Sequence, residues 1–375
     1  MRFRIANSFG RVLMICALWV VTSTFPAQAA PAPKVSPAIA GILDAFKNHS
    51  LVGLGDHHGL AQELDFYSAL ISDPRFANEV GNVVMEFGAV SQPTLDRYLA
   101  GESVGYLELR KVWSESVGWS PDGTYIGFLN LFAQVRSVNA NLPPDKRIHI
   151  WLADPKIDWA KIHTNQEWGA LVRTRDTHAA QIIEDQIMSR GKKALIIYGG
   201  GHFIRDDGQP MKQLRKLIDD RHPGALQVML PYIGFLEKDC SAKLEREFHD
   251  WPVPAIATPV RGSSLEQALQ PEGCHVMKFG NGADIPEEDI KLQKLIADNL
   301  AGLSGDGLLY LGPASTLTIS PKSPDIYMDQ DFRTEMSRRL QIIAGHPLTS
   351  ATAKGNAVSP RFLRPPVEPA AHSGH

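Results

Sequence analysis

Histidine and carboxylate side chains follow three apolar stretches of this chain, each with glycine close by. Leu51–Leu54 precedes Asp56, His57 and His58, Val83–Met85 ends at Glu86, and Ala194–Tyr198 ends in three glycines and His202. A histidine beside a carboxylate can act as a general base, and two histidines with one carboxylate form a common catalytic metal set. These residues therefore predict proton transfer to or from water, with or without a metal ion.

The Asp-His-His run allows more than one interpretation. Asp56 and one histidine could activate a water or bind a metal, whereas Asp56 alone could cap the helix that follows. Adjacent histidines on a loop do not easily face the same point, so we expect one to be functional and the other to pack. We assign the functional role to His58 and a supporting role to His57.

Glu86 lies among apolar residues at the end of a predicted strand, where an unpaired carboxylate would cost several kcal/mol. Arg175 and Asp176 are candidates to pair with it or with a histidine, because both border the apolar stripe of a predicted helix spanning 169–190. Asp154 ends a further predicted strand, 147–154, and is expected behind the reacting groups. The alternative for these charges is a set of purely structural ion pairs.

The glycines before His202 allow close approach of a ligand or of another strand. A phosphate-binding loop is disfavoured, because no helix opens directly after them and no Lys-Ser/Thr pair follows. The chain also has no Gly-x-Ser-x-Gly sequence, which disfavours a serine nucleophile.

Strands and helices alternate through most of the chain, which predicts an α/β fold with a mostly parallel central sheet flanked by helices. In such a sheet, polar residues at the carboxyl ends of strands gather at one edge. A helical insertion, 104–141, is expected to cover the cleft. Its aromatic residues could form an apolar wall or ordinary helix packing; they are Trp113, Trp119, Tyr125 and Phe128.

The ends of the chain have different compositions. Residues 1–29 resemble a signal peptide, with three arginines, an apolar core at Val12–Val21 and a cleavage pattern at Ala27–Ala29. We expect a linker and leading helix at 30–48, the α/β core at 49–235, an α/β extension of the same domain at 236–348 and a disordered tail at 349–375. After cleavage near Ala29 the protein would be secreted or periplasmic, without a permanent membrane span.

The charge balance excludes one class of partner. The formal net charge is −3, and the leader contains three arginines and no acid, so the mature chain carries −6. Nucleic acid is therefore not expected as a partner. Cys240 and Cys274 remain after cleavage and form either a disulfide or two free buried thiols.

Four of these motifs, in this order, resemble the erythromycin-esterase/ChaN/Tiki-like superfamily. Gly55–His58 resembles its Gly-Glu-x-His motif, with Asp56 where the family usually has Glu, and Met85-Glu86 resembles its second motif. Arg175-Asp176 is similar to the Arg-Asp helix of the family, and Gly199–His202 is similar to its glycine-histidine loop. The resemblance covers roughly residues 48 to 235. It implies an α/β fold with a cleft lined by histidines and carboxylates.

The family does not imply a single activity, since its members include esterases, proteins that look like metal-dependent proteases and haem-binding proteins. The first hypothesis is a hydrolase of an ester or amide, in which His58, assisted by Asp56 or Glu86, activates water. His202 or Arg175 would stabilise the oxyanion. A divalent metal held by His58, Glu86 and His202 is a variant. The second hypothesis is a haem- or metal-binding protein that uses His57, His58 or His202 without turnover. The partner expected is a small, apolar molecule or a peptide.

Overall fold

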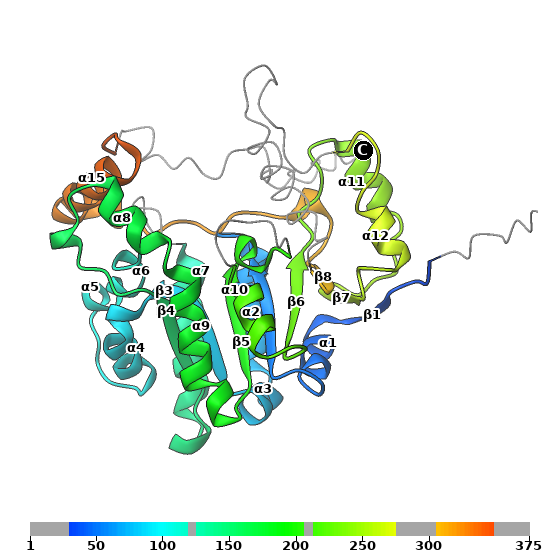
Figure 1. Ribbon diagram of the computed structural model, residues 1–375, viewed down its shortest axis with the longest axis horizontal. Helices are drawn as coiled ribbons and strands as arrows, with labels where there is room; N and C mark the ends of the chain where they lie inside the picture. Colours follow the sequence, from blue (N-terminus) through cyan, green and yellow to red (C-terminus); the bar gives the residue numbers. More distant parts are fainter. Residues whose placement is uncertain (1–29, 119–124, 206–212, 275–304, 349–375) are drawn as a thin grey trace, which may run out of the picture.

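A computed structural model describes residues 30–118, 125–205, 213–274 and 305–348. These residues form an α/β fold around one mostly parallel sheet of eight strands (Figure 1). The order of the strands across the sheet is β1-β7-β8-β6-β2-β5-β3-β4. Only β7 runs against its neighbours β1 and β8. The expected fold class is therefore confirmed.

The strands at the centre of the sheet are buried on both faces, as expected where helices cover a parallel sheet. Each of the four strands β2, β3, β5 and β8 is buried along its whole length. The strands are β1 (Lys34–Pro37), β2 (Leu51–Asp56), β3 (Asn82–Gly88), β4 (His149–Asp154), β5 (Ala194–Gly199), β6 (Leu226–Pro231), β7 (Ala255–Thr258) and β8 (Gly307–Tyr310).

Helices pack on both faces of this sheet (Figure 1). The larger core lies under α1 (Ala38–Ala45), α2 (Ala61–Ser72), α3 (Pro74–Glu79), α4 (Gln92–Leu99) and α7 (Ile126–Ala140). The other face is covered by α9 (Arg175–Gln186) and α10 (Leu214–Arg221). Short 3-10 segments connect several elements: 89–91, 144–146, 159–161, 188–190, 200–203 (η5) and 314–316.

The expected insertion, 104–141, contains α5 (Tyr106–Leu109), α6 (Lys111–Ser114) and α7. Trp113 and Phe128 are buried in the larger core, and the Phe128 ring meets Phe87 edge-on at 5.1 Å between centroids. Tyr125 is also buried in that core. These three aromatic residues therefore pack the fold, while Trp119 lies outside the described residues.

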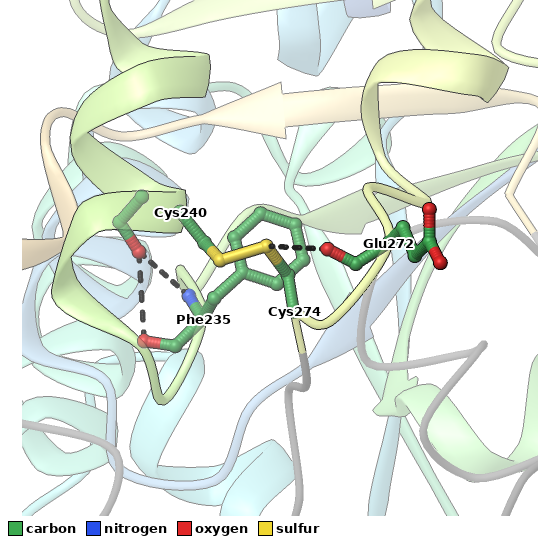
Figure 2. The surroundings of a disulfide bond; sticks show 5 residues. Phe235, Cys240, Glu272 and Cys274 are labelled. Carbon is green, nitrogen blue, oxygen red and sulfur yellow. Dashed lines mark hydrogen bonds between the residues drawn. A yellow bond between two sulfur atoms is a disulfide. The ribbon is translucent and has the colours of Figure 1, made fainter.

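Two further groups of helices lie at opposite ends of the sheet (Figure 1). One consists of α8 (Asn165–Val172), α14 (Asp325–Met328) and α15 (Gln330–Ala344). The other consists of α11 (Lys238–Glu245) and α12 (Ser264–Ala268), which pack with β7 and β8. A disulfide between Cys240 and Cys274 joins α11 to the loop after α12, with the two Cα atoms 5.9 Å apart (Figure 2).

The single helix predicted for 169–190 is wrong. The chain forms α8 and α9, which are separated at Arg173 and Thr174. The apolar residues of α8 pack with Ile342 and Ile343, whereas those of α9 pack on the sheet. The chain has to change direction between these two packing partners, so one straight helix cannot serve both.

The linker predicted before the first helix is also wrong in part, because Lys34–Pro37 forms strand β1. This strand pairs with β7, itself not anticipated, and Val35 packs against the neighbouring core. Pro37 is tolerated there because β1 is the last strand of the sheet. The proposed signal peptide and the disordered tail lie outside the described residues, as does the part of the predicted extension at 275–304. Among the described helices, none is long and apolar enough to cross a bilayer.

Candidate functional site

Four neighbouring strands bring the polar residues to the carboxyl edge of the sheet. Their order is β2-β5-β3-β4, and they end at or near Asp56, Gly199, Glu86 and Asp154 respectively. The strand β5 lies between β2 and β3, although it comes later in the chain. The expected convergence of these strand ends is therefore present in the structure.

Glu86 is the centre of the site and is only 6% exposed. Its Oε2 accepts a 2.6 Å hydrogen bond from the backbone N–H of Gly199, and its Oε1 pairs with Arg175. Nε2 of His202 lies 3.4 Å from Oε1, and Nε2 of His58 lies 4.0 Å from Oε2. Burial alone would raise the pKa of Glu86, but Arg175 and the two histidines hold that pKa well below its usual range. Glu86 is therefore an anion that organises cations and a poor proton acceptor.

Arg175, at the start of α9, joins two strand ends. Its Nε donates to Oδ1 of Asp154 at 2.9 Å, while its terminal nitrogen pairs with Glu86. Asp154 is fully buried, and its other oxygen accepts hydrogen bonds from Ser116 at 2.8 Å and from the N–H of Gly118 at 3.2 Å. Burial opposes the charge of Arg175, but the carboxylates of Glu86 and Asp154 raise its pKa above the usual value. Arg175 is therefore a fixed positive charge beside Glu86.

His202 follows the glycines of β5 and lies between two carboxylates. Its Nδ1 pairs with Asp176 on α9, and its Nε2 faces Glu86. Burial would lower the pKa of His202, but the two carboxylates outweigh burial and raise it to about 10. His202 is consequently an imidazolium at neutral pH, with both N–H groups directed at acids. It can stabilise negative charge but is not a base in this state.

His58 is the histidine that opens to solvent. Its Nδ1 lies 2.6 Å from Oδ2 of Asp56, and its side chain is 45% exposed. Asp56 is buried and also accepts a hydrogen bond from the hydroxyl of Tyr67 at 3.2 Å. Desolvation would lower the pKa of His58, but Glu86 and Asp56 together raise it. The pair of His58 and Asp56 has the arrangement of a general base held and oriented by a carboxylate.

His57 differs from its neighbour. Burial, together with the charge of His58, lowers the pKa of His57 to about 4, so this imidazole is neutral at pH 7. Its backbone N–H donates to Oε2 of Glu63 at 2.8 Å. The structure therefore directs His58, and not His57, toward the Glu86 cluster.

Sequence reasoning missed two residues beneath His58. Glu63 on α2 is fully buried, and burial together with the charge of Asp56 raises its pKa well above the usual value. Tyr67, one turn later, is fully buried and bonds to Asp56. A signal was available, because Glu63 occupies a helix position one turn from Leu60 and Tyr67 and thus lies on the apolar face of α2.

Gly118 is a third residue that sequence reasoning missed. A Cβ atom built on Gly118 would lie 2.2 Å from the terminal nitrogen of Arg175, so glycine leaves room for the guanidinium. The segment that carries Gly118 and Ser116 comes from the predicted insertion. That segment therefore takes part in the site by holding Asp154 and Arg175.

The geometry does not fit a metal held by His58, Glu86 and His202. Both oxygens of Glu86 already face N–H donors, and both nitrogens of His202 face carboxylates and carry protons at neutral pH. A metal ion needs free lone pairs on its ligands. Within the described ranges, no group of three histidine, cysteine, aspartate or glutamate side chains is arranged to hold a metal.

The sequence matches no known family model and no curated protein. Among solved structures, the fold is distantly similar to a structural-genomics protein from Bacillus cereus, with 12% identity, 76% of this chain and 94% of that chain covered, and a TM-score of 0.44. A succinoglycan biosynthesis protein aligns at 10% identity over 52% and 69% of the two chains, with a TM-score of 0.40. ChaN of Campylobacter jejuni, described with cofacial haem binding, aligns at 12% identity over 52% and 86%, with a TM-score of 0.34. At these TM-scores the alignments assign neither a family nor an activity.

Proposed function

We propose that this protein is an exported hydrolase that cleaves an ester or amide bond with water activated by His58. The observation that carries the proposal is the 2.6 Å contact between Nδ1 of His58 and Asp56, made by an imidazole that is 45% exposed. Asp56 would hold the imidazole in the tautomer whose Nε2 accepts a proton from water. The order of the strand-end motifs resembles that of the erythromycin-esterase/ChaN/Tiki-like superfamily, and this resemblance also supports a hydrolase.

The cations beside His58 supply the second requirement of acyl transfer. Attack on a carbonyl group develops negative charge on oxygen, and preorganised positive groups stabilise that charge. Arg175 and His202 are both held near His58 by Glu86, and their side chains are 12% and 17% exposed. In this proposal Glu86 positions the two cations, and Asp56 is the carboxylate that assists His58.

Export is part of the proposal. The leader-like composition of residues 1–29 and the disulfide between Cys240 and Cys274 both favour an oxidising compartment, either the periplasm or the exterior. An ester, lactone or peptide of low polarity is the substrate class that the sequence suggested. The buried aromatic residues of the insertion do not narrow that class further.

The test compares wild-type protein with His58→Gln and His249→Gln on a panel of chromogenic esters, lactones and short peptides. His249 is 70% exposed and lies outside the site, so its variant controls for loss of a histidine. We expect hydrolysis by the wild type and by His249→Gln, and a large loss in His58→Gln. Full activity in His58→Gln would refute the proposal.

Two further measurements separate the alternatives. Activity should persist in excess chelator, because the donor atoms of Glu86 and His202 are already engaged; abolition by chelator would restore the metal variant. Titration with haemin should produce no absorption band that depends on His58. A stoichiometric haem band that disappears in His58→Gln, in a protein without hydrolase activity, would favour the binding-protein alternative.

A further inference from the structure

A cleft lies at the edge of the sheet opposite the His58 site, where β3, β4 and β5 begin. In Figure 1 this is the lower edge, beside α3. The cleft has a volume of about 590 Å³ and is lined mainly by polar groups. We call it the amino-edge cleft and define it by Asn82, Lys146, Arg147, His149, Lys192 and Lys193. None of these residues belongs to the His58 site.

The charge of the amino-edge cleft is opposite to that of the whole chain. Five cations line it, namely Lys146, Arg147, Arg190, Lys192 and Lys193, against the two acids Glu79 and Asp145. The cleft therefore carries a formal charge of +3, whereas the chain carries −3. Within the part of the chain that the structure describes, none of the five cations has an ion-pair partner within 4.0 Å. This excess of positive over negative charge creates a positive potential that attracts anions.

Two nitrogen atoms of residues that line the cleft are buried without a hydrogen-bond partner among the described residues. They are Nε of Arg147 and Nε2 of His149. The nearest acid to Nε2 of His149 is Asp96, at 3.7 Å, beyond hydrogen-bonding distance. A buried polar group without a partner is costly, so these atoms mark two side chains whose hydrogen-bonding capacity the described residues leave unsatisfied. The guanidinium of Arg147 can bind oxyanions by two parallel hydrogen bonds.

The walls of the cleft are fixed by hydrogen bonds. The side chain of Asn82 donates to the carbonyl oxygens of Val80 at 3.1 Å and Lys193 at 3.0 Å. It also accepts from the indole N–H of Trp151 at 3.3 Å, and the ring of Trp151 lies 3.9 Å from that of His149. Asn82 thereby ties together the loops that precede β3 and β5 and the strand β4. The cations are thus presented on a braced frame, and less entropy is lost when a ligand binds.

We propose that the amino-edge cleft is a binding site for a phosphate-bearing molecule, with Arg147 as the bidentate ligand and Lys146, Lys192 and Lys193 as neutralising charges. Phosphate fits this set because it offers several acceptor oxygens and more than one negative charge. The site does not depend on the proposed hydrolase activity. The phosphate could belong to a free molecule or to the headgroup of a lipid, since both present the same chemistry.

The experiment uses the mature chain and measures binding of pyrophosphate by calorimetry at low ionic strength. We expect saturable binding to the wild type, weakened about tenfold or more in Arg147→Gln/Lys192→Gln. A second variant, Lys146→Gln/Lys192→Gln, changes only exposed side chains and guards against misfolding of the first. The control Lys243→Gln/Arg246→Gln removes the same charge near α11 and should bind as the wild type does.

A parallel arm measures sedimentation with vesicles of phosphatidylglycerol and with vesicles of phosphatidylcholine. Pyrophosphate binding that is lost only in the cleft variants supports a free phosphate ligand. Binding to phosphatidylglycerol alone, lost in the same variants, supports a lipid headgroup. Absence of both, or equal weakening in the cleft variants and the Lys243→Gln/Arg246→Gln control, would overturn the proposal.

Discussion

Nε2 of His202 lies 3.4 Å from Oε1 of Glu86, and this contact explains how a buried carboxylate is retained at the end of β3. Glu86 cannot be hydrated, so its charge has to be balanced by protein groups. Arg175 and the protonated His202 provide that balance from the α9 side of the sheet. The same contact keeps the imidazole of His202 protonated, which leaves the role of base to His58.

Replacing Glu86 with Gln should destabilise the protein strongly. The change keeps the shape of the side chain but leaves Arg175 and His202 without their shared anion, at a cost of roughly 3–5 kcal/mol. The pKa of Glu86 is depressed in the folded state. Its contribution to the free energy of unfolding is therefore present above pH 4.5 and is lost as the pH falls through the lowered pKa. Urea unfolding at pH 7 measures the effect. The exposed control Glu247→Gln should be neutral, and similar losses in both variants would contradict the assignment.

The rate of hydrolysis should rise with pH as His58 loses its proton. Glu86 and Asp56 raise the pKa of His58 above 6.5, so the limb of the kcat/KM profile should have its midpoint above that value. His58→Gln should lower kcat/KM by about 10²–10⁴-fold, the usual contribution of general base catalysis. Asp56→Asn should move the midpoint to lower pH. A profile unaffected by Asp56→Asn would show that Asp56 does not act on the base.

His202 should make stability depend on alkaline pH. The pKa of His202 is raised to about 10 in the folded state. Its contribution to the free energy of unfolding is therefore complete below pH 6.5 and is lost as the pH rises toward about 10. His202→Gln should remove that dependence and flatten the curve of unfolding free energy between pH 7 and pH 10. Denaturant titrations at several pH values test this. If the dependence of unfolding free energy on pH were unchanged in His202→Gln, another group would be responsible for the loss of stability at alkaline pH.

Gly118→Ala should disturb the site without changing any charge. The added Cβ would lie 2.2 Å from a guanidinium nitrogen of Arg175, so Arg175 must shift away from Asp154 or Glu86. Overpacking of this kind costs about 1–3 kcal/mol of stability. Displacement of the Arg175 cation should also lower kcat, whereas KM should change less. Gly105→Ala is the matched control, because nothing lies within 4 Å of its added Cβ. Equal behaviour of the two variants would argue against a role for Gly118.

The ends of the strands were predictable, whereas the pairing of charges was not. Apolar runs that stop at Asp56, Glu86 and Asp154 reveal parallel strands, and parallel strands share a carboxyl edge. Which acid meets which histidine depends on the order of strands across the sheet, and local sequence does not reveal that β5 separates β2 from β3. The preference of His58 for Asp56 over Glu86 follows from that order and from the turn between Asp56 and His58.

Other features of the structure could not be predicted from the sequence, because they arise from packing between distant segments. The break at Arg173 and Thr174 contains no proline or glycine, so no local signal separates α8 from α9. It arises because the two helices pack against different partners. The role of Gly118 could not be predicted either, because it depends on contact with Arg175, which is distant in the sequence, and not on the local backbone conformation of Gly118. Glu63, in contrast, lies on the apolar face of the helix that follows the Asp-His-His run and could have been found from the helical spacing of Leu60, Glu63 and Tyr67.

The position of β5 in the sheet also determines when the protein can assemble during synthesis. β2 and β3 leave the ribosome before β5, yet they do not pair with each other, and the edges that face one another stay open until β5 is inserted between them. Until residue 199 has emerged, the two strands expose unpaired backbone edges, and Glu86 lacks the N–H of Gly199. Open strand edges favour aggregation, so nascent chains that stall before β5 would be the species most dependent on chaperones.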